Sequence, residues 1–129
     1  MILRLPLRFE GNVGEKILYA LFDSGATYSC INSEIAEEIE TLIPLHRPMK
    51  MLTTSVAAII EVKQRIVTDF YYDDIRLTDE FYVIPNLSEQ AIIGASTMQK
   101  WKIKLDFEHD TIVLDPGAAK AILVSLIAG

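Results

Sequence analysis

An acidic side chain, a hydroxyl and a glycine follow one another where a long apolar run ends. The run covers residues 16–22 and stops at Asp23, Ser24 and Gly25. A carboxylate at the end of a strand can act as a general acid or base, and an Asp that only closes a turn is the plainer alternative. Ser24 lacks the Gly-x-Ser-x-Gly elbow of serine hydrolases, so its hydroxyl does not predict a nucleophile. Asp23 is therefore the candidate for chemistry in this segment.

The residues around Asp23 resemble the active-site signature of aspartic proteases, and the single short copy resembles the retroviral-type, or retropepsin-like, branch. The signature is the run Asp23-Ser24-Gly25-Ala26-Thr27 behind an apolar strand. Later in the chain, Ala91-Ile92-Ile93-Gly94 resembles the family's hydrophobic-hydrophobic-Gly motif, and Lys104-Leu105-Asp106-Phe107 resembles the strand that follows it. The resemblance extends over residues 16–115 and implies that these elements lie beside the active-site loop.

This resemblance implies a homodimeric aspartic endopeptidase. One Asp-Ser-Gly triplet in 129 residues is too little for the two-lobed form of the fold, so a second copy must supply the second carboxylate. Two carboxylates about 3 Å apart share one proton and offer a base and an acid to one water molecule. By resemblance Asp23 is catalytic, and Ser24, Gly25, Ala26 and Thr27 support its loop. The implied substrate is an extended, apolar-rich peptide or protein segment, and no cofactor is expected.

The flap is the first departure from the family pattern. Family members cover the substrate with a hairpin whose tip is usually rich in glycine, whereas the corresponding segment here has none. Its tip and substrate-contacting residues are expected to be Ser55, Val56, Ala57 and Ala58. A working flap and an ordinary buried hairpin are equally compatible with this segment. A stiffer flap would make cleavage slow or narrow in specificity.

An ion pair of the retroviral members is also missing, because Thr27 and Ala95 occupy the positions of its Asp and Arg. By resemblance, that pair supports the dimer interface, so its absence bears on the strength of the dimer. Two further functions therefore stay open. One is a catalytically inactive module that holds a peptide by strand addition, and the other is a dimerisation unit within a longer chain.

Composition excludes several other classes. A formal net charge of −6 and scattered basic residues argue against nucleic-acid binding. Cys30 is the only cysteine, which rules out an internal disulfide and fits a reducing compartment such as the cytoplasm; we expect it to be a small buried hydrophobe. His46 and His109 have no neighbours at ligand spacing, so no metal site is expected.

Patterning predicts an all-β, acid-protease (retropepsin-like) closed barrel with one or two short helices. Residues 16–22 are expected to form a central strand covered on both faces. A helix after Asn32 or Ser33 would extend to Ile43 before Pro44 ends it. Ser96-Thr97-Met98-Gln99 matches a capping box that opens a second helix.

Three turns are expected between the later strands. They lie at Asp73-Asp74, at Thr78-Asp79 and at Glu108-His109-Asp110. The protease domain is assigned to residues 1–116.

The apolar tail, residues 117–129, has three alternatives. It could be a strand in a dimer interface, a helix packed on its own subunit, or a segment that leads into a longer polypeptide. It is too short to span a bilayer, so no membrane span is expected in this chain.

Overall fold

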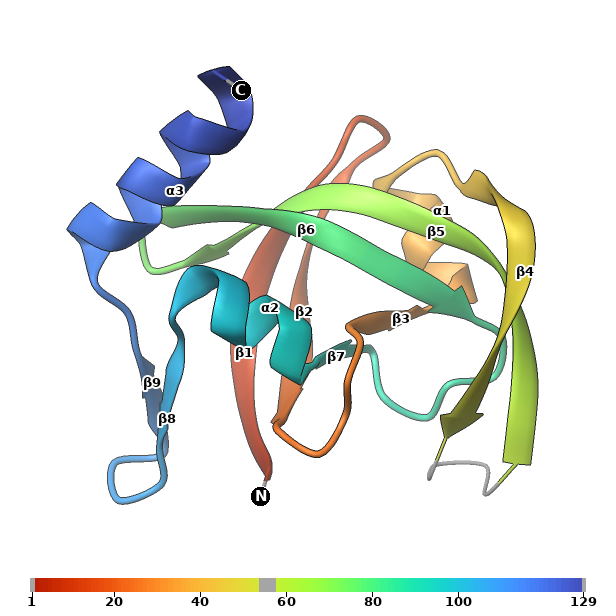
Figure 1. The fold of residues 1–129 in the computed structure, drawn as a ribbon, viewed down its shortest axis with the longest axis horizontal. Coiled ribbons are helices and arrows are strands. Elements are labelled where there is room, and N and C mark those ends of the chain that lie inside the picture. Colours follow the sequence, from red (N-terminus) through yellow and green to blue (C-terminus); the bar gives the residue numbers. More distant parts are fainter. Residues whose placement is uncertain (1, 54–57, 129) are drawn as a thin grey trace.

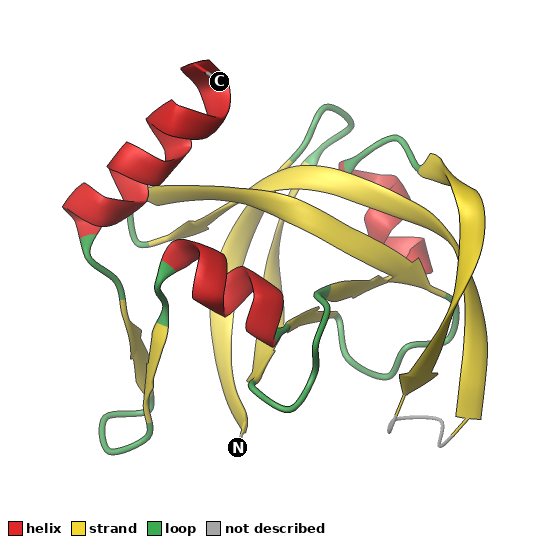
Figure 2. Cartoon of the chain, in the orientation of Figure 1, coloured by secondary structure: helices red, strands yellow, loops and turns green. Residues whose placement is uncertain are grey.

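A computed structural model describes residues 2–53 and 58–128 and contains nine strands and three helices within them (Figures 1 and 2). The strands are β1 (Ile2–Glu10), β2 (Glu15–Asp23), β3 (Cys30–Asn32), β4 (Ile43–Thr53), β5 (Ala58–Tyr72), β6 (Ile75–Ile84), β7 (Ala91–Ile93), β8 (Lys104–Asp106) and β9 (Thr111–Val113). The helices are α1 (Ser33–Ile39), α2 (Ala95–Trp101) and α3 (Pro116–Ala128).

The main sheet closes on itself. Its strand order is β1-β2-β7-β3-β6-β5-β4, and β1 also pairs with β5, so six strands form a closed barrel from which β4 extends. β2 and β7 run parallel, with Leu21 beside Ile92. The expectation of an all-β fold built on a closed barrel is confirmed. Three helices accompany it rather than one or two.

Alternating side chains of the strands fill the barrel. The aromatic rings of Phe9, Phe70 and Phe81 are fully buried and pack with centroids 5.4 to 5.6 Å apart. Such aromatic pairs stabilise a core beyond the area they bury. Trp101 of α2 joins this core, and its indole N–H donates to the carbonyl oxygen of Thr78. The helix is thereby fixed against β6.

The first helix is shorter than predicted. The side chain of Asn32 caps α1 by accepting from the N–H groups of Glu34 and Ile35, as expected. The helix then ends at Ile39, and Ile43 already begins β4. Pairing of Ile43 with β5 outweighs the helical spacing of the apolar residues here.

The expected turn at Thr78-Asp79 is not formed, because β6 continues through both residues and pairs with β5. The turns at Asp73-Asp74 and at residues 108–110 lie between paired strands, as predicted. β2 also differs from its prediction: Ile17 is 72% exposed and Tyr19 59% exposed, so its first half is not covered on both faces.

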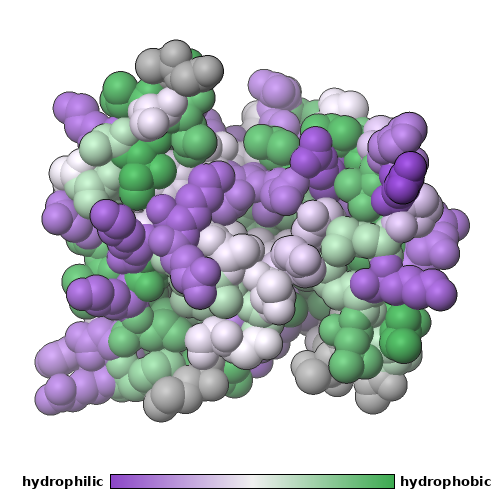
Figure 3. Space-filling view, in the orientation of Figure 1, coloured by the Kyte–Doolittle hydropathy of each residue, from purple (hydrophilic) through white to green (hydrophobic). Residues whose placement is uncertain are grey.

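The tail forms helix α3 rather than an interface strand. Asp115 caps the helix, since its Oδ1 accepts from the N–H groups of Gly117 and Ala118. Ala119 is fully buried, and the helix packs against β6 and α2. This is the second of the three alternatives, a helix packed on its own subunit. Apolar side chains remain on its outer surface (Figure 3).

Neither α3 nor any other helix within the described ranges is long and apolar enough to cross a membrane.

Candidate active site

Asp23 is the last residue of β2 and lies on the wall of a cleft of about 540 Å³. The cleft is lined by β2, the active-site loop at residues 24–28, β4 and the segment that leads into β7. The lining includes Asp23, Gly25, Ala26 and Thr27, four of the residues that the sequence analysis singled out. Ser24 lies in the same loop with its side chain exposed.

The active-site loop is folded around the Asp23 carboxylate. The N–H of Gly25 donates to Asp23 Oδ1 at 2.9 Å, and the N–H of Ala26 donates to the carbonyl oxygen of Asp23 at 3.1 Å. A Cβ on Gly25 would stand 3.2 Å from Asp23 Oδ1. No described glycine has a positive φ, so the need for glycine here comes from crowding at the carboxylate and not from a left-handed turn.

Backbone hydrogen bonds fasten this loop to α2. The N–H of Ala95 donates to the carbonyl oxygen of Ala26 at 2.7 Å, and the N–H of Ser96 donates to that of Thr27 at 3.0 Å. These bonds join the two segments that contain Thr27 and Ala95. The predicted capping box is wrong, because α2 begins before Ser96: Gly94, which has no side chain, is its N-cap, and the loop carbonyls accept from the first N–H groups of the helix.

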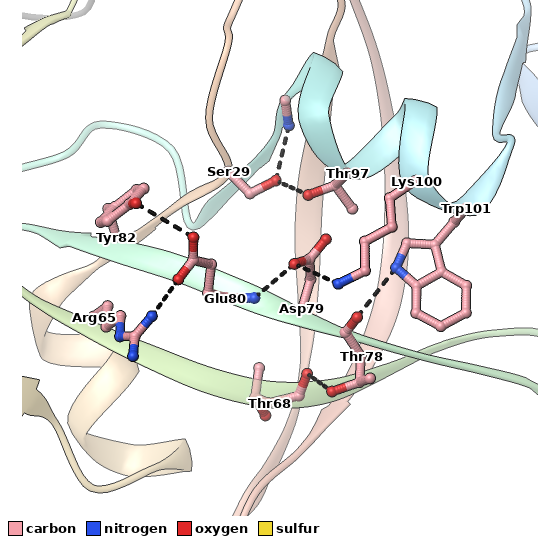
Figure 4. Close-up of polar contacts among 11 residues, drawn as sticks. Ser29, Arg65, Thr68, Thr78, Asp79, Glu80, Tyr82, Thr97, Lys100 and Trp101 are labelled. Carbon is pink, nitrogen blue, oxygen red and sulfur yellow. Dashed lines mark hydrogen bonds and ion pairs between the residues drawn. The ribbon is translucent and has the colours of Figure 1, made fainter. Parts of the chain in front are cut away.

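A buried hydroxyl pair supports the same junction (Figure 4). The Ser29 and Thr97 hydroxyls lie 2.5 Å apart, and Ser29 Oγ accepts from the N–H of Gly94 at 3.0 Å. Both side chains are almost completely buried. Sequence reasoning missed this pair, because no local pattern links the two residues and 68 positions separate them.

The segment predicted to be a flap lies between β4 and β5, which pair as neighbouring antiparallel strands. Of its predicted residues, Ser55, Val56 and Ala57 lie outside the described residues, and Ala58 begins β5 opposite Thr53. The arm of β4 contributes side chains to the cleft that the sequence did not single out. These are Lys50, Met51 and Leu52.

Cys30 lines the cleft as a buried thiol. Burial raises its pKa to about 12, so the thiol is uncharged near neutral pH. Its Sγ lies 3.7 Å from the sulfur of Met51 and packs in a small apolar cluster with Val62, Ile84 and Leu87. The expectation of a small buried hydrophobe is confirmed.

A second carboxylate lies at the cleft but is already paired. Glu89 accepts from Arg4 at 2.6 Å, and the two residues are 85 positions apart. Within the described ranges, no group of three or more His, Cys, Asp or Glu side chains is arranged to hold a metal ion. Asp23 is thus the cleft-lining carboxylate with no ion-pair partner among the described residues.

The family model for retroviral aspartyl proteases matches residues 8–106. The chain belongs to the retroviral aspartyl protease family. A solved structure has a similar fold: the retroviral protease-like domain of Ddi1 from Leishmania major aligns with a TM-score of 0.66 and 23% identity over 89% of each chain. At this identity the comparison supports the fold, which agrees with the closed barrel and the cleft.

Proposed function

We propose that this retropepsin-like domain is a homodimeric aspartic endopeptidase that cleaves extended, apolar-rich peptide segments. The observation that carries the proposal is the Asp23 carboxylate, which lies in the cleft with Oδ1 held by the Gly25 N–H. The other carboxylate in the cleft lining is that of Glu89, which is neutralised by Arg4. Each chain therefore contributes one carboxylate for catalysis.

A second copy completes the chemistry. When two Asp23 side chains face each other across a two-fold axis, repulsion keeps one of them protonated. The ionised carboxylate takes a proton from a water molecule, which attacks the peptide carbonyl, while the protonated one donates to the carbonyl oxygen. The pair titrates as a unit. The Gly25 N–H fixes the orientation of each carboxylate before the water binds.

Features around the active-site loop support a dimer. The side chains of Ser24 and Thr27 are exposed and available to a second copy. β8 and β9 form a separate two-stranded sheet that projects from the barrel toward the same side as the active-site loop (Figure 1). Val113 of β9 is half exposed. Family members typically dimerise.

The lining of the cleft supports an apolar substrate preference. Its apolar members come from β2, β4, β6, β7 and the segment between β6 and β7, and include Leu21, Met51, Ile84, Leu87 and Ile92. A peptide that lies extended across them places alternate side chains against this wall. Burial of such side chains contributes roughly 25 cal/mol per Å² of apolar surface.

The test compares the parent protein with Asp23→Asn on a mixed peptide library between pH 4 and 7, with products identified by mass spectrometry. Asn keeps an oxygen that can accept from the Gly25 N–H but cannot serve as the base. Protein concentration is raised until sedimentation shows a dimer. Cuts made by the parent and absent from the variant are the expected result.

Absence of any Asp23-dependent cut, from protein shown to be folded and dimeric, would contradict the proposal. Peptide binding without cleavage would then identify the inactive peptide-binding module. A dimer that binds no peptide would identify a dimerisation unit.

A further inference from the structure

Tyr28 separates the cleft from a second cavity. Tyr28 follows Thr27 in the active-site loop and is 41% exposed. It lines both the 540 Å³ cleft and a smaller cavity of about 150 Å³, which we call the outer hollow. The outer hollow lies between β6 and α2 and includes Ser96 and Lys100 in its lining. A peptide that leaves the cleft over Tyr28 therefore enters the outer hollow.

An aromatic pair forms one wall of the outer hollow. The rings of Tyr28 and Tyr82 meet edge to face, with centroids 5.5 Å apart and an angle of 82° between the planes. The Tyr82 hydroxyl donates to Glu80 Oε1 at 3.3 Å, which orients that ring further. The faces of tyrosine rings attract cations and accept the aliphatic stems of long side chains.

Two carboxylates and one ammonium group complete the lining (Figure 4). Asp79 Oδ1 accepts from the N–H of Glu80 at 2.9 Å and from Lys100 Nζ at 3.4 Å. The Asp79 side chain is only 11% exposed, and no described residue donates a hydrogen bond to its Oδ2. Glu80 pairs with Arg65 at 2.6 Å, outside the lining of the hollow.

We propose that the outer hollow is a specificity subsite that takes an Arg or Lys side chain of the substrate. This inference rests on the peptidase function proposed above. The aliphatic stem of the substrate side chain crosses the Tyr28 and Tyr82 rings, and its charged head donates to Asp79 Oδ2. Charge-assisted hydrogen bonds of this kind are stronger than neutral ones. Tyr28 and Asp79 are then specificity-determining residues.

Lys100 sets the strength of this preference. Its ammonium group forms an ion pair of 3.4 Å with Asp79 Oδ1 and lies 5.9 Å from the centre of the Trp101 ring. Lys100 repels a substrate cation that binds Asp79 Oδ2. Removing the charge of Lys100 must therefore strengthen binding of a substrate with Arg or Lys at this position. An acidic substrate side chain would instead be repelled by Asp79 Oδ2, to which no described residue donates a hydrogen bond.

The experiment measures peptide binding to the Asp23→Asn protein by fluorescence anisotropy, so that catalysis is not needed for the readout. Labelled apolar peptides carry Arg, or its uncharged analogue citrulline, at each outer position in turn. We expect Arg to bind about five- to tenfold more tightly than citrulline at one outer position. Parallel cleavage by the parent protein reports the same preference in kcat/KM.

Three further substitutions are made in the Asp23→Asn protein. Asp79→Asn keeps the Oδ1 acceptor for the Glu80 N–H but removes the charge, and should abolish the Arg preference. Lys100→Met should increase it, a change that loss of structure cannot mimic. Glu38→Gln is the matched control, because Glu38 also pairs with a lysine, Lys16, but lies on α1; it should leave the preference unchanged.

The outcomes separate this inference from the proposed function. Cleavage by the parent with no preference for Arg over citrulline, or a preference that persists in Asp79→Asn, overturns the subsite and leaves the peptidase intact. An Arg preference in binding that depends on Asp79, from a protein that cleaves nothing, supports the subsite and overturns catalysis. A failure of all peptides to bind at millimolar concentration overturns the subsite.

Discussion

The backbone N–H of Ala95 donates to the carbonyl oxygen of Ala26 at 2.7 Å, which joins the first turn of α2 directly to the active-site loop. Retroviral members join the same two segments through side-chain charges, whereas Thr27 and Ala95 cannot do so here. Backbone bonds depend on close approach of the two segments. The position of Asp23 therefore depends on residues that allow this approach.

Gly94 is the residue that allows it. A Cβ at this position would stand 2.5 Å from the Tyr28 carbonyl oxygen and 3.0 Å from that of Ala26. Both contacts are with backbone, so relief requires the loop to move. We expect Gly94→Ala to lower the free energy of unfolding by about 1–3 kcal/mol and to reduce peptidase activity strongly, as measured by urea denaturation and by library cleavage.

Gly117→Ala is the control for this prediction, because its Cβ would meet only the Asp115 side chain, at 3.3 Å. That variant should remain within about 0.5 kcal/mol of the parent. Equal destabilisation by the two substitutions would show that crowding at the Tyr28 carbonyl is not the cause.

The Ser29–Thr97 pair should stabilise the folded protein as well as position the start of α2 beside the active-site loop. Ser29→Ala leaves the Gly94 N–H and the Thr97 hydroxyl without their partner, both in a buried site. An unsatisfied buried polar group costs about 1–3 kcal/mol. Thr97→Val should lower the free energy of unfolding less in the Ser29→Ala protein than in the parent, because in Ser29→Ala the Thr97 hydroxyl has already lost its partner. Urea denaturation of the four proteins measures this coupling, and strictly additive losses would contradict it.

The sequence predicted the parts of this protein that depend on local patterning. The apolar run before Asp23 and the Ile92-Ile93-Gly94 element become neighbouring strands β2 and β7, as the family resemblance implies. Alternating residues also predicted the β8–β9 hairpin, because strand periodicity is a local property.

The features that it missed are tertiary. Ser96 and Gln99 fit a capping box, but the carbonyl groups of a distant loop bond the helix start instead. The outer hollow beside Tyr28 depends on the packing of β6 against α2, which no local pattern in the sequence predicts. The apolar run over the tail is compatible with a strand or a helix, and packing of Ala119 against the barrel selects the helix.

The β8–β9 turn should have an acid-sensitive contact. The pKa of Asp106 is lowered from its ordinary value of 3.8, mainly because its carboxylate shares a hydrogen bond with the His109 side chain. Because the folded-state pKa is lowered, this carboxylate stabilises the turn above pH 3.8, and the contribution is lost as the pH falls through the lowered pKa. His109→Gln should move the Asp106 pKa upward in a carboxyl NMR titration. An unchanged value would contradict the assignment, and His46→Gln serves as the control.

Cys30 should make stability fall at alkaline pH. Its folded-state pKa is raised from 9.0 to about 12 by burial, so the unfolded chain loses the thiol proton first as the pH increases. The free energy of unfolding should therefore decrease progressively from about pH 9 to about pH 12. Cys30→Ala should reduce this slope, measured by urea denaturation at a series of pH values, despite its lower stability at neutral pH.

In the folded parent protein, iodoacetamide should modify Cys30 far more slowly than in urea, because the reactive thiolate is scarce. Equal labelling rates in the two states, or an alkaline slope that Cys30→Ala leaves unchanged, would show that the thiol is not buried in the cleft wall as described.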